Sequence, residues 1–141
     1  MAGPPVGGRR EARERALGLL YEADAKGDDP RDVLAALPAR PDEYAAVLVA
    51  GVAEHVDAID DYLRRYARDW TVERMPVIDR MLLRMAVFEL LHRDDVPTGV
   101  VISEAVELAK AYSTDDSSRF VNGLLAAVAD EIRPGTQHTS G

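Results

Sequence analysis

Apolar residues recur at helical spacing along most of the chain, and no stretch shows the period-two alternation of a half-buried strand. The pattern predicts a first helix from about Arg9 to Lys26. It ends at Gly27, because glycine readily adopts the left-handed conformation that follows a helix. The stripe expected to be buried consists of small and aliphatic side chains: Ala12, Ala16, Leu19, Leu20 and Ala23.

The remaining apolar pattern predicts further helices separated by prolines and polar links. A short helix is predicted at 30–37. A long helical pattern follows at about 42–69, and because it exceeds the usual helix length we consider a break near Asp60-Asp61. Trp70 and Thr71 mark a joint. The last three helices are predicted from Pro76 to about Arg93, from Pro97 to Tyr112, and from the 113–116 link to Ile132.

These elements predict an all-α protein of six to seven helices packed as two small helical bundles. One helical domain is expected over residues 9–133, with halves at about 9–69 and 70–133 and loose tails at 1–8 and 134–141. A chain of 141 residues is long enough to bury a sizeable core.

The charge is unevenly distributed. The formal net charge is −8, yet residues 1–20 carry four arginines against two glutamates. An acidic body suits a basic partner, whereas a local arginine cluster can bind phosphates. The chain has no cysteine, and its longest uncharged apolar run, Tyr44–Ala53, is too short to span a membrane. We therefore expect a cytoplasmic protein without a metal, cofactor or membrane association.

No enzyme motif is present: there is no phosphate-binding loop, HExxH pair or nucleophile elbow. The three histidines, His55, His92 and His138, are 37 or more residues apart, and His55 is interpreted as a core or boundary side chain. The paired aspartates at 28–29, 60–61, 94–95 and 115–116 are interpreted as caps at helix ends rather than cation ligands. Catalysis is not expected.

Three segments are candidates for binding. Arg9, Arg10 and Arg13 lie on one side of the first helix and could contact adjacent phosphates, although a solvated helix start is the favoured explanation when this segment is taken alone. Near the last helix, Phe120 could stack on a base while Arg119 binds phosphate and Asn122 reads a base edge. Phe120 could also be a core residue. The helix that Pro76 begins, with Asp79 beside Arg80, offers either a protein interface or a solvated face.

The order of several motifs resembles the NusB family of bacterial transcription antitermination factors. The matching stretches are Arg9-Arg10 to Leu20-Tyr21, Pro76-Val77-Ile78-Asp79-Arg80 to Glu89-Leu90, Asp95-Val96-Pro97, Glu104 to Lys110, and Asp116-Ser117 with Phe120-Val121-Asn122-Gly123. The last two are specific in combination. The resemblance covers about residues 9–133, which is nearly the whole chain.

The resemblance implies two small helical bundles that bind boxA-type single-stranded RNA. Binding is joint with NusE, a ribosomal protein, and it supports the RNA polymerase antitermination complex during ribosomal RNA transcription. Carried over by position, the RNA-binding residues are Arg9, Arg10, Arg13, Arg119, Phe120 and Asn122. The partner-binding residues are Tyr21, Asp79, Leu82 and Asp116.

Two alternatives stay open. A NusB-like domain also occurs at the N-terminus of some ribosomal RNA cytosine methyltransferases, which need a further catalytic domain with a reactive cysteine. Because this chain ends soon after its helical part and has no cysteine, we expect the stand-alone factor. The second alternative is a self-associating helical module, since an apolar surface that binds a partner can also form a homodimer.

Overall fold

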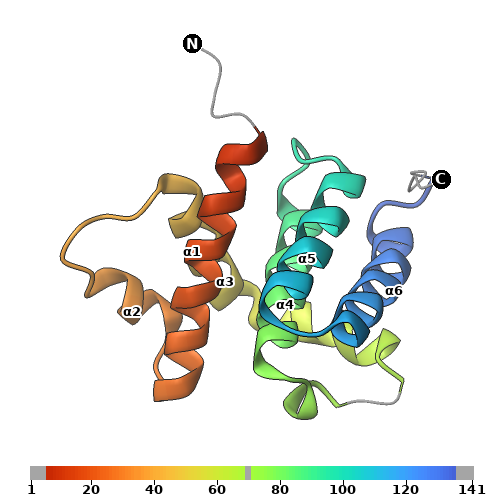
Figure 1. Ribbon diagram of the computed structural model, residues 1–141, viewed down its shortest axis with the longest axis horizontal. Coiled ribbons are helices and arrows are strands. Elements are labelled where there is room, and N and C mark those ends of the chain that lie inside the picture. The colour runs from red at the N-terminus through yellow and green to blue at the C-terminus, as the bar shows by residue number, and fades with distance from the viewer. Residues whose placement is uncertain (1–5, 69–70, 136–141) are drawn as a thin grey trace. The chain divides into compact units, whose positions relative to one another are not determined.

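The computed structural model describes residues 6–68 and 71–135, and this part of the chain contains six α-helices, one 3-10 turn and no β-strand. The elements are α1 (Val6–Lys26), α2 (Pro30–Ala35), α3 (Glu43–Tyr66), η1 (Val72–Arg74), α4 (Val77–His92), α5 (Thr98–Tyr112) and α6 (Asp115–Ile132) (Figure 1). The predicted all-α class is confirmed. Trp70 and His138 lie outside the described residues. None of the helices described is long and apolar enough to cross a membrane.

The chain forms two compact units, Met1–Glu54 and His55–Gly141, called here the N-terminal and C-terminal units. The division falls at His55, where the backbone of α3 leaves helical geometry with φ −112° and ψ 17°. It lies earlier than the position near residue 70 expected from the sequence. The break considered near Asp60-Asp61 is also misplaced, because the apolar pattern of α3 continues past His55 and gives no signal there.

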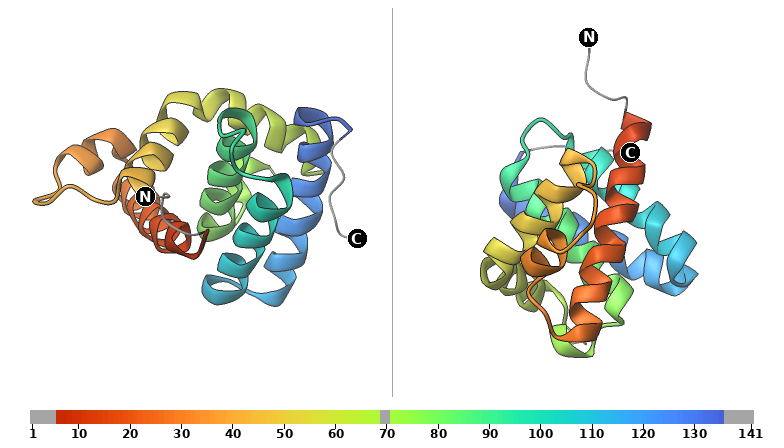
Figure 2. Two further views of the ribbon diagram at one scale, coloured as in Figure 1. Left: turned by 90° about the horizontal axis from the view of Figure 1, so that it is seen from above. Right: turned by 90° about the vertical axis from the view of Figure 1, so that its left-hand side faces the viewer.

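In the N-terminal unit, α1 packs on α2 (Figure 2). The helix α1 begins at Val6, so part of the predicted loose tail at 1–8 is helical. The predicted stripe is buried, and Leu17, which is not part of that stripe, is buried as well. Gly27 ends α1 with φ +70°, as predicted. The buried face of α1 is thus wider than the sequence pattern indicated.

The start of α2 confirms the capping interpretation of the aspartate pair at 28–29. Asp29 is the N-cap residue, and its Oδ1 accepts a hydrogen bond from the Arg31 backbone N–H at 2.8 Å. The Arg31 guanidinium donates to both Asp29 carboxylate oxygens, at 3.1 and 2.8 Å. These hydrogen bonds to Arg31 lower the pKa of Asp29 below its usual range. Pro30 then occupies the first helical position. Proline has no backbone N–H, but at this position the N–H would have no acceptor within the helix.

In the C-terminal unit, α4, α5 and α6 lie side by side and pack on one another (Figure 2). Their core consists of aliphatic side chains from all three helices, among them Leu83, Val87, Leu108, Val121, Leu125 and Val128. Thr114 caps α6, because its Oγ1 accepts a hydrogen bond from the Ser117 backbone N–H at 2.9 Å. Asp115 and Asp116 occupy the first turn of α6, as the capping interpretation predicted.

A nearly buried ion pair joins the second half of α3 to α4. Arg84 donates from Nε and Nη2 to the two carboxylate oxygens of Asp60, at 2.9 and 2.7 Å. The side chains of Arg84 and Asp60 are only 18% and 10% exposed. The interpretation of Asp60-Asp61 as a helix cap is therefore wrong, since both residues lie inside α3. Asp60 instead fixes the position of α3 against α4.

A second connection between helices predicts a pH dependence of stability. Glu131 on α6 accepts hydrogen bonds from the Tyr66 hydroxyl at 2.5 Å and from Arg65 Nη1 at 2.7 Å. The Tyr66 hydrogen bond, and after it Arg65, lower the pKa of Glu131 below its usual range. A carboxyl whose pKa is lowered by folding stabilises the protein above its unfolded pKa, and this contribution disappears as the pH falls through the folded value.

We expect Glu131→Gln to lower the Tm at pH 7, and the difference from wild type to shrink once the pH falls below about 4. Thermal unfolding followed by circular dichroism at pH 7, 5, 4 and 3 measures it. Glu107→Gln is the matched control, because Glu107 makes only an exposed i,i+3 pair with Lys110. An equal loss in Tm for Glu131→Gln at every pH would contradict the electrostatic explanation.

Candidate nucleic-acid interface

The predicted arginine cluster of α1 is organised by one tyrosine of α3. The Arg9 guanidinium lies over the Tyr44 ring, 4.3 Å from its centroid, and the Arg13 guanidinium lies 5.7 Å from the same centroid. Arg9 is half-buried and Arg10 is exposed. Arg13 is only 2% exposed. Arg9 and Arg10 can therefore reach a phosphate from solvent, whereas Arg13 is a buried residue, contrary to the prediction.

At the start of α6, the predicted RNA residues point in different directions. Arg119 is exposed and pairs through Nη2 with Asp116 one turn earlier. Phe120 is half-buried, so part of its side chain packs against the protein and part is exposed to solvent. Asn122 is exposed but lies two residues after Phe120, which places it about 200° around the helix. The expectation that Asn122 and Phe120 read one base together is therefore not supported by the helix geometry.

A pocket of about 450 Å³ lies between the start of α4 and the start of α6 in the C-terminal unit. Its lining consists of Pro76, Asp79, Ser113, Thr114, Asp116, Ser117 and Phe120. Three of these were predicted from the sequence, but in separate roles: Phe120 for RNA, and Asp79 and Asp116 for a protein partner. The structure brings the three into one pocket.

Asp79 gives this pocket a chemical preference. The residue is 2% exposed, and its Oδ1 has no hydrogen-bond partner among the described residues. A buried acceptor without a donor costs about 1–3 kcal/mol. A ligand that donates a hydrogen bond to this carboxylate would recover part of that cost. Because Asp79 and Asp116 are both acceptors, the pocket favours an N–H group over an anion such as phosphate.

The pocket has the parts needed to hold one unpaired nucleobase. The Phe120 ring offers a stacking surface, and the carboxylates of Asp79 and Asp116 can accept hydrogen bonds from base amino or imino groups. The Ser113 hydroxyl donates to the Ser117 hydroxyl at 2.9 Å, which orders the polar side of the pocket. The pocket can therefore hold a base, whereas Arg9 and Arg10 of the N-terminal unit can contact phosphate.

A family model decides the identity of the fold: the NusB family model matches residues 10–130. The chain belongs to the NusB family. It is 50% identical over 129 residues to the "Transcription antitermination protein NusB" of Salinispora tropica, an alignment that covers 86% of this chain and 95% of the relative.

Solved NusB structures have the same fold. A Thermotoga maritima ("T. maritima") NusB structure has a TM-score of 0.80 and 34% identity, and the match covers 93% of this chain and 94% of that one. A crystal structure described as antitermination factors NusB and NusE in complex with dsRNA has a TM-score of 0.74 and 28% identity, covering 87% and 96%. The predicted family and its two-bundle helical fold are thereby confirmed.

The predicted partner-binding residues of this NusB-family chain differ in accessibility. Tyr21 on α1 is 47% exposed, one of two large hydrophobic side chains so exposed among the described residues. Leu82 on α4 is 1% exposed, so it is a core residue and can influence a partner only through the packing of α4. Asp116 is exposed, and Asp79 is buried at the pocket. Tyr21 and Asp116 are thus the two that a partner can touch directly.

Several residues that shape this NusB-family site were missed by sequence reasoning. Tyr44 was considered only as part of the apolar run Tyr44–Ala53, yet its ring lies beneath the Arg9 guanidinium. Ser113 and Thr114 were interpreted only as a link between helices. Both line the pocket at the N-terminus of α6, and the sequence signal for this position was the capping side chain of Thr114. The structure also stacks the rings of His55 and His92, with centroids 4.2 Å apart, despite their separation in sequence. In the described part of the chain, no cluster of three or more potential metal ligands is found.

Proposed function

We propose that this protein is a cytoplasmic transcription antitermination factor that binds boxA-type single-stranded RNA jointly with the ribosomal protein NusE. In this role it supports the RNA polymerase complex that transcribes ribosomal RNA, and it acts by binding rather than by catalysis. Its relatives carry the name transcription antitermination protein, and a structure of the same fold is described as NusB and NusE in complex with dsRNA.

The observation that carries the proposal is the pocket between α4 and α6. Phe120 supplies a stacking surface there, and the unpartnered Asp79 Oδ1 calls for a donor from the ligand. A base inside a duplex cannot present both its face and its pairing edge, whereas an unstacked base in a single strand can. The geometry therefore supports a single strand with one base in the pocket.

The phosphate contacts are assigned to exposed or half-exposed arginines. Arg9 and Arg10 serve in the N-terminal unit and Arg119 serves in the C-terminal unit. The acidic remainder of the chain suits NusE if that protein is basic, as ribosomal proteins commonly are in order to bind RNA. RNA and NusE that each stabilise the other's binding would show a coupling of about 1–3 kcal/mol.

A fluorescence-anisotropy titration tests the proposal with a boxA-like RNA, a scrambled strand and the boxA-like RNA annealed to its complement. Each is measured with and without NusE. We expect the single boxA-like strand to bind most tightly and NusE to tighten it further. Equal, weak binding of all three RNAs with NusE present would refute the proposed function. Light scattering at several protein concentrations independently tests the alternative that the chain forms a homodimer.

Arg10→Ala should weaken RNA binding and change its salt dependence. Three arginines that each neutralise one phosphate predict a slope of log affinity against log salt near −2, from about −0.7 per phosphate. Removing Arg10 should make that slope shallower by about 0.7. Titrations between 50 and about 300 mM KCl measure it. Arg68→Ala is the matched control, because Arg68 is exposed and has no assigned role. An unchanged slope and affinity would remove Arg10 from the site.

A further inference from the structure

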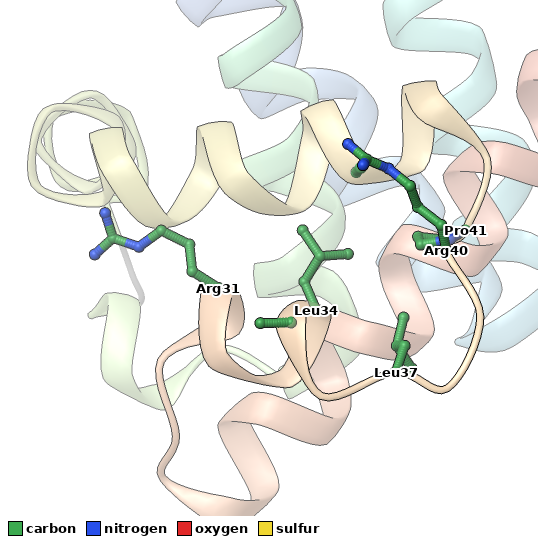
Figure 3. A pocket seen from close by; sticks show the side chains of 7 residues that line it. Arg31, Leu34, Leu37, Arg40 and Pro41 are labelled. Atoms are coloured by element: carbon green, nitrogen blue, oxygen red, sulfur yellow. The ribbon is translucent and has the colours of Figure 1, made fainter.

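The N-terminal unit contains another pocket, which the RNA proposal does not use. It has a volume of about 340 Å³ and lies among α2, the link after α2 and the first turns of α3 (Figure 3). The lining residues are Arg31, Leu34, Ala35, Leu37, Arg40, Pro41 and Ala46. All of them belong to one compact unit, so the pocket does not depend on how the two units are arranged.

The floor of this pocket is aliphatic and still partly open to solvent. Leu34 and Leu37 are half-buried, and no aromatic residue is among the lining residues. Figure 3 shows Leu34 between the side chains of Arg31 and Arg40. Ligand sites commonly combine an apolar lining with a few fixed polar groups. This one combines two leucines with two guanidinium groups.

The two arginines differ in how they are held. Asp29 binds Arg31 through Nε and Nη2, which fixes the orientation of its guanidinium and leaves Nη1 without a hydrogen bond in the described residues. Arg40 is exposed, and within the described residues it makes no ion pair or hydrogen bond. The chain has 25 acidic and 17 basic side chains, so an arginine without an acidic partner is conspicuous. The pocket thus offers unsatisfied donors on both sides of an apolar floor.

We propose that this pocket binds an acidic peptide segment of a partner protein, in which an aliphatic side chain lies between two carboxylates. The aliphatic side chain covers Leu34 and Leu37, and the carboxylates accept hydrogen bonds from Arg40 and from Nη1 of Arg31. The chemistry disfavours an unpaired nucleobase, because no aromatic stacking surface is among the residues that line the pocket. The proposal is independent of RNA binding elsewhere in the molecule.

The test uses three fluorescein-labelled peptides with the cores Glu-Leu-Glu, Gln-Leu-Gln and Glu-Ser-Glu, each flanked by glycines. Fluorescence anisotropy with the full chain should show the tightest binding for Glu-Leu-Glu, and this binding should weaken as salt is added. Arg40→Gln should weaken Glu-Leu-Glu binding about tenfold, and Leu34→Ser should remove the preference for leucine over serine. Amide chemical shifts of Ala35 and Ala46 should move on titration with Glu-Leu-Glu.

Arg68→Gln is the matched control, since Arg68 is an exposed arginine of the C-terminal unit that does not line the pocket. Equal binding of the three peptides would overturn the proposal, and so would an Arg40→Gln variant that binds Glu-Leu-Glu like the wild type. A boxA-like RNA is titrated in parallel. If Arg40→Gln weakens RNA binding instead of peptide binding, the pocket belongs to the RNA and the peptide proposal is wrong.

Discussion

Arg133→Ala is expected to lower the free energy of unfolding by about 3 kcal/mol. At the end of α6, the Arg133 guanidinium uses all five of its N–H donors on the last turn of α4, the turn that follows it and the first residue of α5. The acceptors are the backbone carbonyls of Glu89, Leu90, Arg93 and Val96 and the Thr98 hydroxyl, at 2.8 to 3.2 Å. Two of these carbonyls lie in the last turn of α4, where the helix provides few donors of its own.

The expected loss corresponds to a fall in Tm of about 10 °C for a chain of this length. Chemical unfolding in urea, followed by circular dichroism, measures the free energy directly. Arg133→Lys should recover only part of it, because an ammonium group has three donors and no planar fork. Lys110→Ala is the control: Lys110 is exposed, and its loss should change stability by less than about 0.5 kcal/mol. A loss for Arg133→Ala as small as that of Lys110→Ala would contradict the role assigned to Arg133.

Phe120→Ala is expected to weaken binding of boxA-like RNA by about 1–3 kcal/mol, which is roughly 5- to 150-fold in Kd. The reason is the loss of the stacking surface in the pocket beside Asp79 and Asp116. Fluorescence anisotropy measures the affinity, and circular dichroism checks that the variant remains helical. A variant that loses helicity would show that the ring belongs to the core. Tyr62→Ala is the control, a partly exposed aromatic with no RNA role assigned to it.

A set of RNAs, each with one abasic position, shows whether the ring and a base meet. One abasic position should weaken binding to wild type and have little effect on Phe120→Ala, since the two changes remove the same contact. Asp79→Asn keeps the size of the side chain and removes its charge. We expect it to retain or increase stability, because a buried carboxylate oxygen without a hydrogen-bond donor among the described residues is costly, and to alter the base preferred at the same position. Additive effects of Phe120→Ala and every abasic position would exclude base stacking on Phe120.

Much of the fold follows from local sequence signals. The helix that ends at Gly27, the Asp29 cap of α2, and the prolines before α4 and α5 all appear where the sequence predicts them. These signals act within a few residues, through backbone conformation and capping hydrogen bonds. The division at His55 was missed, because His55 sits in an uninterrupted apolar pattern and the change of backbone geometry there has no local sequence marker.

The site was predicted only in part. Arg9 and Arg10 could be recognised by charge, and Phe120 and Asp116 by their motif, and the structure leaves all four accessible to some degree. Arg13 was placed on the same side of α1 as Arg9, which is correct, but helical spacing alone does not reveal that its side chain is buried. Likewise, helical spacing alone does not show whether a leucine lies at the surface or in the core, and Leu82 is part of the core.

The order of helices, their ends and the family membership are readable from the chain, because they depend on neighbours in sequence and on motifs in a given order. Three features cannot be predicted from the sequence in this way: the ion pair of Asp60 with Arg84, the hydrogen bonds of the Arg133 guanidinium, and the pocket lined by Asp79 and Phe120. Each brings together residues that are 24 or more positions apart in the chain. Such contacts arise only when the helices pack, since packing decides which polar groups lose water and must find a partner.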